Sequence, residues 1–240
     1  MSRTIGLIGG MSWESTATYY RAINELVRDR QGGLASADIL MQSVNFEEIV
    51  ALQKAGDWDG AADRLGTIGA NLASIGAGCI LICTNTMHLV ADQVAALAGV
   101  PLIHIVDATG AALKKAGAKR PLLLATRYTM EEGFYLRRLK ECAGIEALVP
   151  EIRDRDLVHT IIFDELCKGI VNDRSRDEYL RIIQRGAERG ADSVILGCTE
   201  IGLLINQSHS PLPTFDSTLI HATAAVDFAE AAERAVRNAA

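Results

Sequence analysis

The sequence predicts an α/β fold of two pseudo-symmetric domains, each a mainly parallel sheet flanked by helices. Short apolar runs alternate with longer helical patterns, which is typical of βαβ units. Similar stretches also recur at a nearly constant separation along the chain. Two of the apolar runs end in Cys-Thr, at Cys83 and Cys198. These observations predict a fold made of two related halves.

The predicted strands are rich in Ile, Leu and Val, and small or polar residues follow most of them. We expect strands at Thr4–Ile8, Ile39–Val44, Cys79–Cys83, Leu102–Val106, Pro121–Ala125, Ile145–Leu148, Ser193–Gly197 and Pro213–Phe215. We expect helices near 13–30, 57–75, 86–98, 107–117, 129–142, 154–168, 175–190 and 217–237.

Three ordered pairs of stretches indicate an internal repeat. GAGCILICTN (76–85) resembles GADSVILGCTE (190–200), PLIHIVDATG (101–110) resembles PLPTFDSTLI (211–220), and TIGLIGG (4–10) resembles PLLLATR (121–127). All βα units share a strand, a small-residue turn and a helix, but three matches in order favour duplication. Because we expect the last helix to pack on the first half, the predicted domains are 1–112 plus 217–240, and 113–216.

The composition excludes several classes of function. The chain has 240 residues, 49% of them hydrophobic, and a net charge of −6, which argues against a nucleic-acid-binding surface. Its five cysteines include no C-x-x-C pair and no zinc-finger spacing, so we expect free thiols in a reducing compartment. The N-terminal stretch does not resemble a signal peptide, and no stretch is long enough to span a membrane. We therefore expect a cytoplasmic protein with a small-molecule partner, not a nucleic acid or a membrane.

Polar residues follow several predicted strands, where ligands bind in parallel sheets. These stretches are GGMSWE (9–14), CTNT (83–86), ATRYT (125–129) and CTE (198–200). Small donors at the start of a helix suit an anion such as a carboxylate.

Cysteine at such a position suits acid–base chemistry. A helix N-terminus is expected to lower the pKa of the thiol and make the sulfur a usable base or nucleophile. Two sulfurs on opposite sides of a substrate would invert a stereocentre, because one removes a proton and the other delivers one. A hydrolase using Cys83 and His88 is a competing interpretation, although capping or packing is the more usual role for His88. Cys79, Cys142 and Cys167 are expected to be ordinary buried or helical cysteines.

The motifs GLIGGMSWEST, CTNTMH, ATRYTM, IIFDELCKG and GCTEIGLL resemble those of the aspartate/glutamate racemase family, in its aspartate racemase and broad-specificity branch. The resemblance covers essentially the whole chain. It implies an active site in an interdomain cleft, two catalytic cysteines, no metal or organic cofactor, and a homodimer.

The resemblance also implies residue roles. Cys83 and Cys198 match the catalytic pair. The positions matched to the substrate pocket are Gly10, Met11, Asn85, Thr86, Thr126, Lys168, Thr199 and Glu200. Glu200 stands where related glutamate racemases have His, which leaves open the group that tunes the second thiol. Lys168 matches a position that can meet a distal carboxylate, with a solvated helix-end lysine as the alternative. An Arg expected near residues 43–49 is replaced by Glu47 and Glu48.

The sequence therefore predicts a cofactor-independent aspartate or glutamate racemase that transfers a proton between two cysteines. One alternative is a broad-specificity racemase of neutral amino acids. A maleate isomerase, a hydantoin racemase and an arylmalonate decarboxylase are further enzyme alternatives, although the decarboxylase is expected to lack one of the two cysteines. A non-catalytic amino-acid-binding protein on the same scaffold is the alternative from another class.

Overall fold

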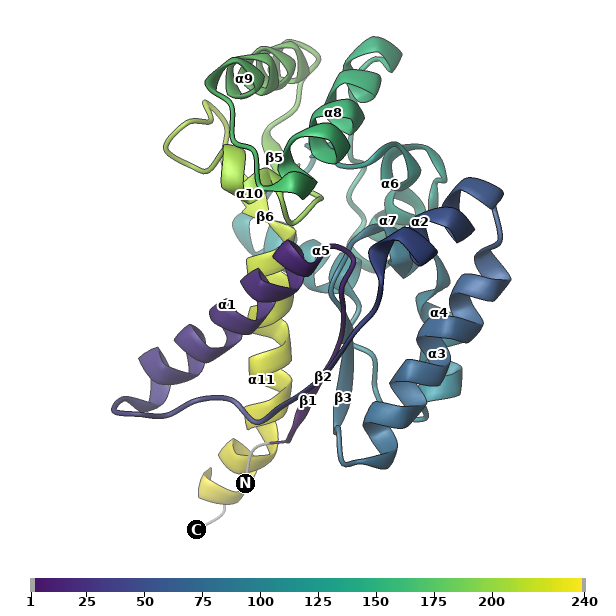
Figure 1. The fold of residues 1–240 in the computed structure, drawn as a ribbon. Coiled ribbons are helices and arrows are strands. Elements are labelled where there is room, and N and C mark those ends of the chain that lie inside the picture. Colours follow the sequence, from purple (N-terminus) through teal and green to yellow (C-terminus); the bar gives the residue numbers. More distant parts are fainter. Residues whose placement is uncertain (1–2, 239–240) are drawn as a thin grey trace. The chain divides into compact units, whose positions relative to one another are not determined.

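The computed structural model describes residues 3–238 of the chain (Figure 1). The chain divides into two compact units. Unit 1 consists of the residues up to His104 together with those from His221 onward, and unit 2 of Ile105–Ile220.

Unit 1 is built on a parallel sheet with the strand order β2-β1-β3. The strands are β1 (Ile5–Gly9), β2 (Ile39–Ser43) and β3 (Cys79–Ile82). Leu102 adds a single parallel bridge to Ile80 on the far side of β3. The strand predicted at Leu102–Val106 is thus only a bridge, because a helix begins at Ile105.

Helices cover both faces of this sheet (Figure 1). On one face lie α1 (Trp13–Gln31) and the part of α11 (Ser217–Asn238) that belongs to unit 1; on the other lie α2 (Phe46–Ala55), α3 (Trp58–Ser74) and α4 (Ala91–Ala98). Side chains alternate along β1, so Ile5 and Leu7 pack toward α1 and α11 while Ile8 packs toward α3 and α4. Burial of these apolar faces is what holds the layers together.

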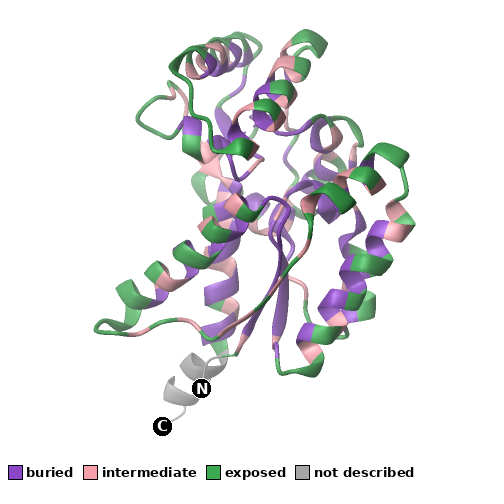
Figure 2. Ribbon diagram, in the orientation of Figure 1, coloured by how far each residue is buried: buried purple, intermediate pink, exposed green. Residues whose placement is uncertain are grey.

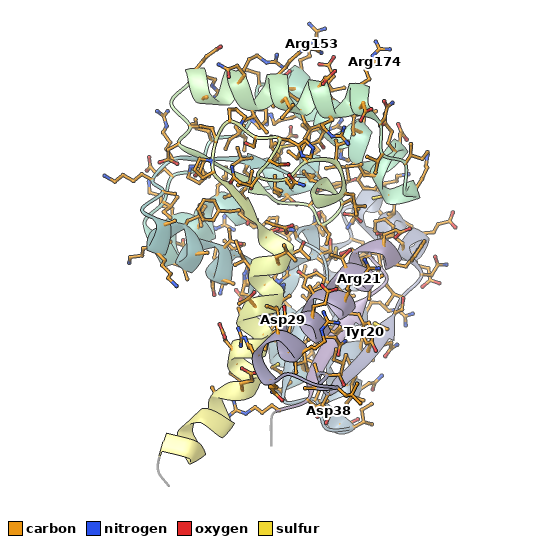
Figure 3. The ribbon with its side chains drawn as sticks, turned by 90° about the vertical axis from the view of Figure 1, so that its left-hand side faces the viewer. Tyr20, Arg21, Asp29, Asp38, Arg153 and Arg174 are labelled. Carbon is orange, nitrogen blue, oxygen red and sulfur yellow. The ribbon has the colours of Figure 1, made fainter. Side chains whose placement is uncertain are left out.

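Helix α1 is amphipathic, and its two faces are easily distinguished. Tyr19 is fully buried and packs in the core against the sheet. The neighbouring Tyr20 and Arg21 are exposed and project from the helix (Figure 3). The strands β1 and β3 are buried along their whole length (Figure 2).

Helix α2 was not expected from the sequence. The Asn45 side chain caps it by accepting a hydrogen bond from the backbone N–H of Glu47, and Gly56 ends it in a left-handed conformation with φ 69°. Ile49 is its buried anchor. The cap and the glycine were readable signals, but the segment between them is short and mixed in polarity.

Unit 2 contains a second parallel sheet, with the strand order β4-β5-β6. Its strands are β4 (Pro121–Leu124), β5 (Ser193–Leu196) and β6 (Thr214–Asp216). Leu148 adds a parallel bridge to Leu122, which is all that forms of the strand predicted at Ile145–Leu148.

The helical segments of unit 2 follow the predicted pattern with some breaks. They are α5 (Ile105–Ala116), α6 (Arg127–Glu131), α7 (Phe134–Ala143), α8 (Ile152–Asp164), the 3₁₀ turn η2 (Leu166–Lys168), α9 (Asp173–Glu188) and α10 (Ile201–Leu204). The helix predicted at 129–142 is two helices, because Gly133 takes a left-handed conformation with φ 72° between them. Arg153 of α8 and Arg174 of α9 project outward from this unit (Figure 3).

The sequence-predicted domain limits and the unit limits differ at both crossings. The sequence predicted limits at 112/113 and 216/217, whereas the units change at 104/105 and 220/221. Helix α5 therefore belongs to unit 2, where Arg138 of α7 makes two hydrogen bonds of 2.7 and 2.8 Å to the carboxylate of Asp107. Such a bidentate pair fixes one helix against the other.

The two sheets repeat one arrangement, as the duplicated stretches predicted. In strand order, β1 corresponds to β4, β3 to β5, and the Leu102 bridge to β6, and a helix follows the last of these in each case. The predicted α/β class with parallel sheets flanked by helices is confirmed. Among the helices of residues 3–238, none is both long and apolar enough to cross a membrane.

Candidate active site

Cys83 continues the line of β3 at its carboxyl end. Its backbone N–H donates to the carbonyl of Ile8 in β1 at 2.9 Å, and its own carbonyl accepts from Ser15 Oγ at 2.7 Å. The residue is fully buried. Two elements far away in the sequence, β1 and the start of α1, thus fix the backbone that carries this sulfur.

The turn between β1 and α1 positions Ser15 for this contact. Gly10 has φ 90°, and a Cβ there would collide with the backbone of Val44, so this position requires glycine. The backbone N–H of Gly10 donates to Thr16 Oγ1 at 2.7 Å, and Ser12 Oγ accepts from the N–H of Ser15. The sequence after β1 is therefore a compact turn held by its own hydroxyl groups. Met11 lies in it, buried.

Asn85 and Thr86 follow Cys83 and are both buried. Thr86 opens a 3₁₀ turn, η1 (Thr86–Val90), and the α-helix begins only at Ala91. The predicted helix 86–98 is thus split, and its regular part starts well beyond the cysteine. Asn85 makes no side-chain capping hydrogen bond to that turn.

Three histidines gather behind the Cys83 segment in unit 1. His88 Nδ1 lies 2.8 Å from the carbonyl of Thr84, and because a carbonyl only accepts, Nδ1 carries the proton. The His88 ring contacts the rings of His104 and His221, with centroid distances of 4.7 and 5.4 Å. These contacts agree with the capping or packing role that the sequence favoured for His88 over a Cys/His hydrolase.

His221 is the residue through which α11 supports this region. Its Nε2 lies 2.6 Å from the carbonyl of Ile103, and its Nδ1 lies 2.7 Å from Tyr19 Oη, so Nε2 donates and the tyrosine hydroxyl donates to Nδ1. Complete burial lowers the pKa of His221 to about 4. The ring is therefore neutral at physiological pH. Sequence reasoning missed His104 and His221, because their contacts link distant parts of the chain.

In unit 2, Cys198 lies beyond the carboxyl end of β5 in the position that corresponds to Cys83. The backbone N–H of Gly197 continues the ladder to the carbonyl of Leu124 at 2.7 Å. The Cys198 thiol donates to Glu200 Oε2 at 2.9 Å. The Cys167 thiol reaches the other oxygen of the same carboxylate, Oε1, at 3.8 Å. Cys167, which was expected to be an ordinary helical cysteine, is thus part of this cluster.

The surroundings of the two strand-end thiols correct one prediction. A lowered pKa was expected from a helix N-terminus, but burial raises the pKa of Cys83, which has no exposed surface. Burial also raises the pKa of Cys198, and the negative charge of Glu200 adds to the effect while the Glu200 backbone N–H opposes it. Desolvation is the largest cause at both sites, so both thiols hold their protons strongly.

The remaining candidate residues of unit 2 fall into two groups. Thr126 caps α6 by accepting from the N–H of Thr129, and it is buried, as are Thr199 and Glu200. Lys168 differs, because its side chain is 61% exposed and its Nζ lies 3.8 Å from Asp164. This exposed pair is of a kind that contributes little to stability.

Among the side chains that the structure describes, those of residues 3–231, no group of three or more His, Cys, Asp or Glu is arranged to hold a metal ion. The predicted independence from cofactors stays a prediction.

Comparison with known proteins identifies the family. The Asp/Glu/Hydantoin racemase family model matches residues 8–225. The chain belongs to this racemase family. A Yersinia pestis structure named as a "putative Asp/Glu Racemase" is 51% identical, with a TM-score of 0.88 over 95% of this chain and 99% of that one.

Two further structures extend the comparison. An aspartate racemase homologue from Pyrococcus horikoshii is 33% identical, with a TM-score of 0.83 over 95% of this chain and 99% of that one. Picrophilus torridus aspartate racemase is 23% identical, with a TM-score of 0.75 over 95% of this racemase and 94% of that chain, and at that identity it supports the fold alone. The protein is an isomerase, an amino-acid racemase.

Proposed function

We propose that this racemase interconverts the enantiomers of aspartate or glutamate by moving the α-proton between the thiols of Cys83 and Cys198. The observation that carries the proposal is the repetition of one arrangement in both units. In each unit, the strand that pairs with β1 or β4 is an apolar run, and a cysteine followed by threonine stands at its carboxyl end. Ligands of parallel sheets bind at these ends.

The proposed chemistry needs one thiolate and one thiol in each direction. The thiolate removes the α-proton, and the thiol on the opposite face of the α-carbon delivers another. A raised thiol pKa makes the corresponding thiolate a stronger base, which suits a carbon acid as weak as an amino acid. Both thiols have this property, because burial raises their pKa values.

Hydrogen-bond donors at the substrate carboxylate would stabilise the carbanion-like state. We assign this role to Asn85, Thr86 and Thr199, three buried polar side chains beside the cysteines. Gly10, Met11 and Thr126 would form further parts of the pocket wall. In this proposal the pocket excludes water during proton transfer.

A broad-specificity racemase of neutral amino acids is the second candidate. The observation in its favour is the placement of Lys168, which is largely exposed and beside Asp164. A distal carboxylate in a buried pocket needs a cation, because an unpaired buried charge is costly. Racemisation of acidic substrates would require Lys168 or another cation to meet that carboxylate.

The test of the function is chiral chromatography after incubation of the purified protein with a panel of L- and D-amino acids. The proposal predicts that aspartate or glutamate racemises from either enantiomer, and that Cys142→Ser, on an exposed cysteine, leaves the rate unchanged. Racemisation of neutral amino acids alone would select the second candidate. No racemisation of any member would contradict both.

From the family resemblance we also infer that the reaction needs no metal or organic cofactor and that the protein is a homodimer. From the expectation of free thiols we infer that it is cytoplasmic. Racemisation should persist after exhaustive chelation and treatment with carbonyl reagents. Light scattering of the purified protein should give twice the mass of one chain. Activity that disappears on chelation and returns with one metal would contradict the first inference, and a monomeric mass the second.

A further inference from the structure

The Glu200 carboxylate is the centre of the thiol cluster in unit 2. Its two oxygens accept hydrogen bonds from two different thiols, Oε2 from Cys198 and Oε1 from Cys167. Glu200 itself is buried and stands at the start of α10, two residues after Cys198. The short local connection therefore sets the distance from Glu200 to Cys198, whereas Cys167 comes to the carboxylate from a separate part of the chain.

Cys167 is held firmly in the turn η2. Leu166, the residue before it, is fully buried and anchors the turn in the interior of unit 2. Glu165 accepts a hydrogen bond of 2.6 Å from Ser175 Oγ, and its backbone carbonyl accepts from the N–H groups of Lys168 and Ile170. The Cys167 thiol is thus directed at Glu200 by a turn that is fixed on both sides.

A buried phenol that interacts electrostatically with this cluster does not provide the same donor. Tyr179 is fully buried, but its hydroxyl donates to the carbonyl of Val158 at 3.2 Å. The hydrogen of Cys167 is in contrast directed at the carboxylate. Burial and the negative charge of Glu200 raise the pKa of Cys167, so it stays a protonated donor throughout the range in which a racemase works. An ionised Cys167 would repel the Cys198 thiolate and add to the rise in the pKa of Cys198, whereas the protonated thiol only donates to Glu200.

We propose that Cys167 is a positioning residue of the racemase: its thiol holds Glu200 and takes up part of the carboxylate charge, which lets Cys198 release its proton. A carboxylate with a single thiol donor would bind the Cys198 hydrogen more strongly and repel the Cys198 thiolate more strongly. The second thiol shares that charge. Cys167 does not touch the reacting carbon and acts only through Glu200.

The consequence for catalysis rests on the proposed function, but the contact itself can be tested without substrate. The measurement is the rate of alkylation of Cys198 by iodoacetamide as a function of pH, read from peptide masses. Cys167→Ala should move the midpoint for Cys198 upward by about 0.5 pH unit, the scale of one hydrogen bond. Cys167→Ser should restore it, because a hydroxyl still donates.

Two controls separate this role from packing. Cys142→Ala, which removes an exposed cysteine from α7, should leave the Cys198 midpoint unchanged. In a Glu200→Gln background, Cys167→Ala should have no further effect, because the charge it shares is gone. If Cys167→Ala does not fold, Cys167→Val gives the same test, since it fills the volume without a donor.

Racemisation provides the second readout. Because the two enantiomers have equal free energy, kcat/KM must fall equally in both directions in Cys167→Ala, and Cys167→Ser should recover it. Three results would each overturn the proposal. The first is an alkylation midpoint of Cys198 that is unchanged or lowered in Cys167→Ala, and the second is an upward shift that Cys167→Ser does not reverse. The third is a shift on Cys167→Ala that is still present in the Glu200→Gln background. A wild-type protein that racemises nothing would contradict the proposed function, while the alkylation result still decides the role of Cys167.

Discussion

Cys83 and Cys198 occupy corresponding positions in two repeats, yet their surroundings differ in charge. In unit 1 the Cys83 segment is fixed by backbone and hydroxyl contacts to Ile8 and Ser15, and burial is what raises its pKa. In unit 2 the Cys198 thiol donates to a carboxylate. The difference lies two residues after each cysteine, where Asn85 stands in one repeat and Glu200 in the other. The two cysteines thus have corresponding backbone positions but different electrostatic surroundings.

This contrast suggests unequal roles for the two thiols when substrate is not bound. A carboxylate beside Cys198 favours its protonated form, whereas no such charge contributes to the pKa of Cys83. We therefore expect Cys198 to be the more strongly protonated partner. Which enantiomer each thiol serves depends on how the substrate is oriented between them.

The largest expected effect comes from removing either thiol. Cys83→Ser and Cys198→Ser should each lower racemisation by roughly 10³-fold or more, because a serine hydroxyl is too weak an acid to replace one of two proton-transferring groups. Chiral chromatography measures this directly. Racemisation at the wild-type rate in either variant would remove that cysteine from the mechanism.

The second effect concerns the support behind Cys83. His221 is neutral in the folded protein with a pKa of about 4, and its unfolded value is near 6.5. The unfolded chain binds more protons between these values, so the free energy of unfolding should fall as the pH drops from about 6.5 to 4, by about 3 kcal/mol in all. Denaturant unfolding across this range checks it.

His221→Gln isolates this contribution, since glutamine carries no titrating group. The variant should show a weaker loss of stability between the same pH values, whereas the exposed His209→Gln should follow the wild type. Equal acid sensitivity in the wild type and His221→Gln would mean that His221 is not the group responsible.

The third effect tests the carboxylate beside Cys198. Glu200→Gln removes the negative charge that helps raise the pKa of this thiol, so the alkylation midpoint of Cys198 should move to lower pH by about one unit. The midpoint of the exposed Cys142 in the same samples should stay where it is. A Cys198 midpoint that does not move would show that burial alone sets its proton affinity, as at Cys83.

The smallest effect concerns substrate choice. If Lys168 meets a distal carboxylate, Lys168→Ala should lower kcat/KM for aspartate and glutamate by about 10-fold, the scale of one charge-assisted contact, and should spare neutral amino acids. Lys140→Ala, on an exposed lysine of α7, is the matched control. An equal effect on both classes of substrate would return Lys168 to a surface role beside Asp164.

The sequence was sufficient to predict the two sheets and the positions of both strand-end cysteines. An apolar run that ends in Cys-Thr is a local pattern, and parallel sheets place such endings at one edge. The family comparison confirms the racemase class. The role of each candidate residue stays a prediction, because contacts within the protein do not show what a substrate touches.

Other features depend on contacts that no local pattern records. Cys167 reaches Glu200 across 33 residues, and His221 reaches Ile103 across 118. The predicted direction of the cysteine pKa shifts was wrong. The prediction considered only the effect of a helix end, whereas complete burial sets the pKa of Cys83. The prediction of a strand at Leu102–Val106 was wrong, because apolar residues such as Ile105 and Val106 occur in buried helices as well as in strands.

The central claim, proton transfer between two thiols, is tested most directly by racemisation in deuterated water at low conversion. With two bases, the product should carry deuterium at Cα from the first turnovers, because its proton comes from the second thiol, while the remaining substrate keeps its original hydrogen. Mass analysis of separated enantiomers gives both values. Early product that retains the substrate hydrogen would mean that one base removes and returns the same proton, and would contradict the account.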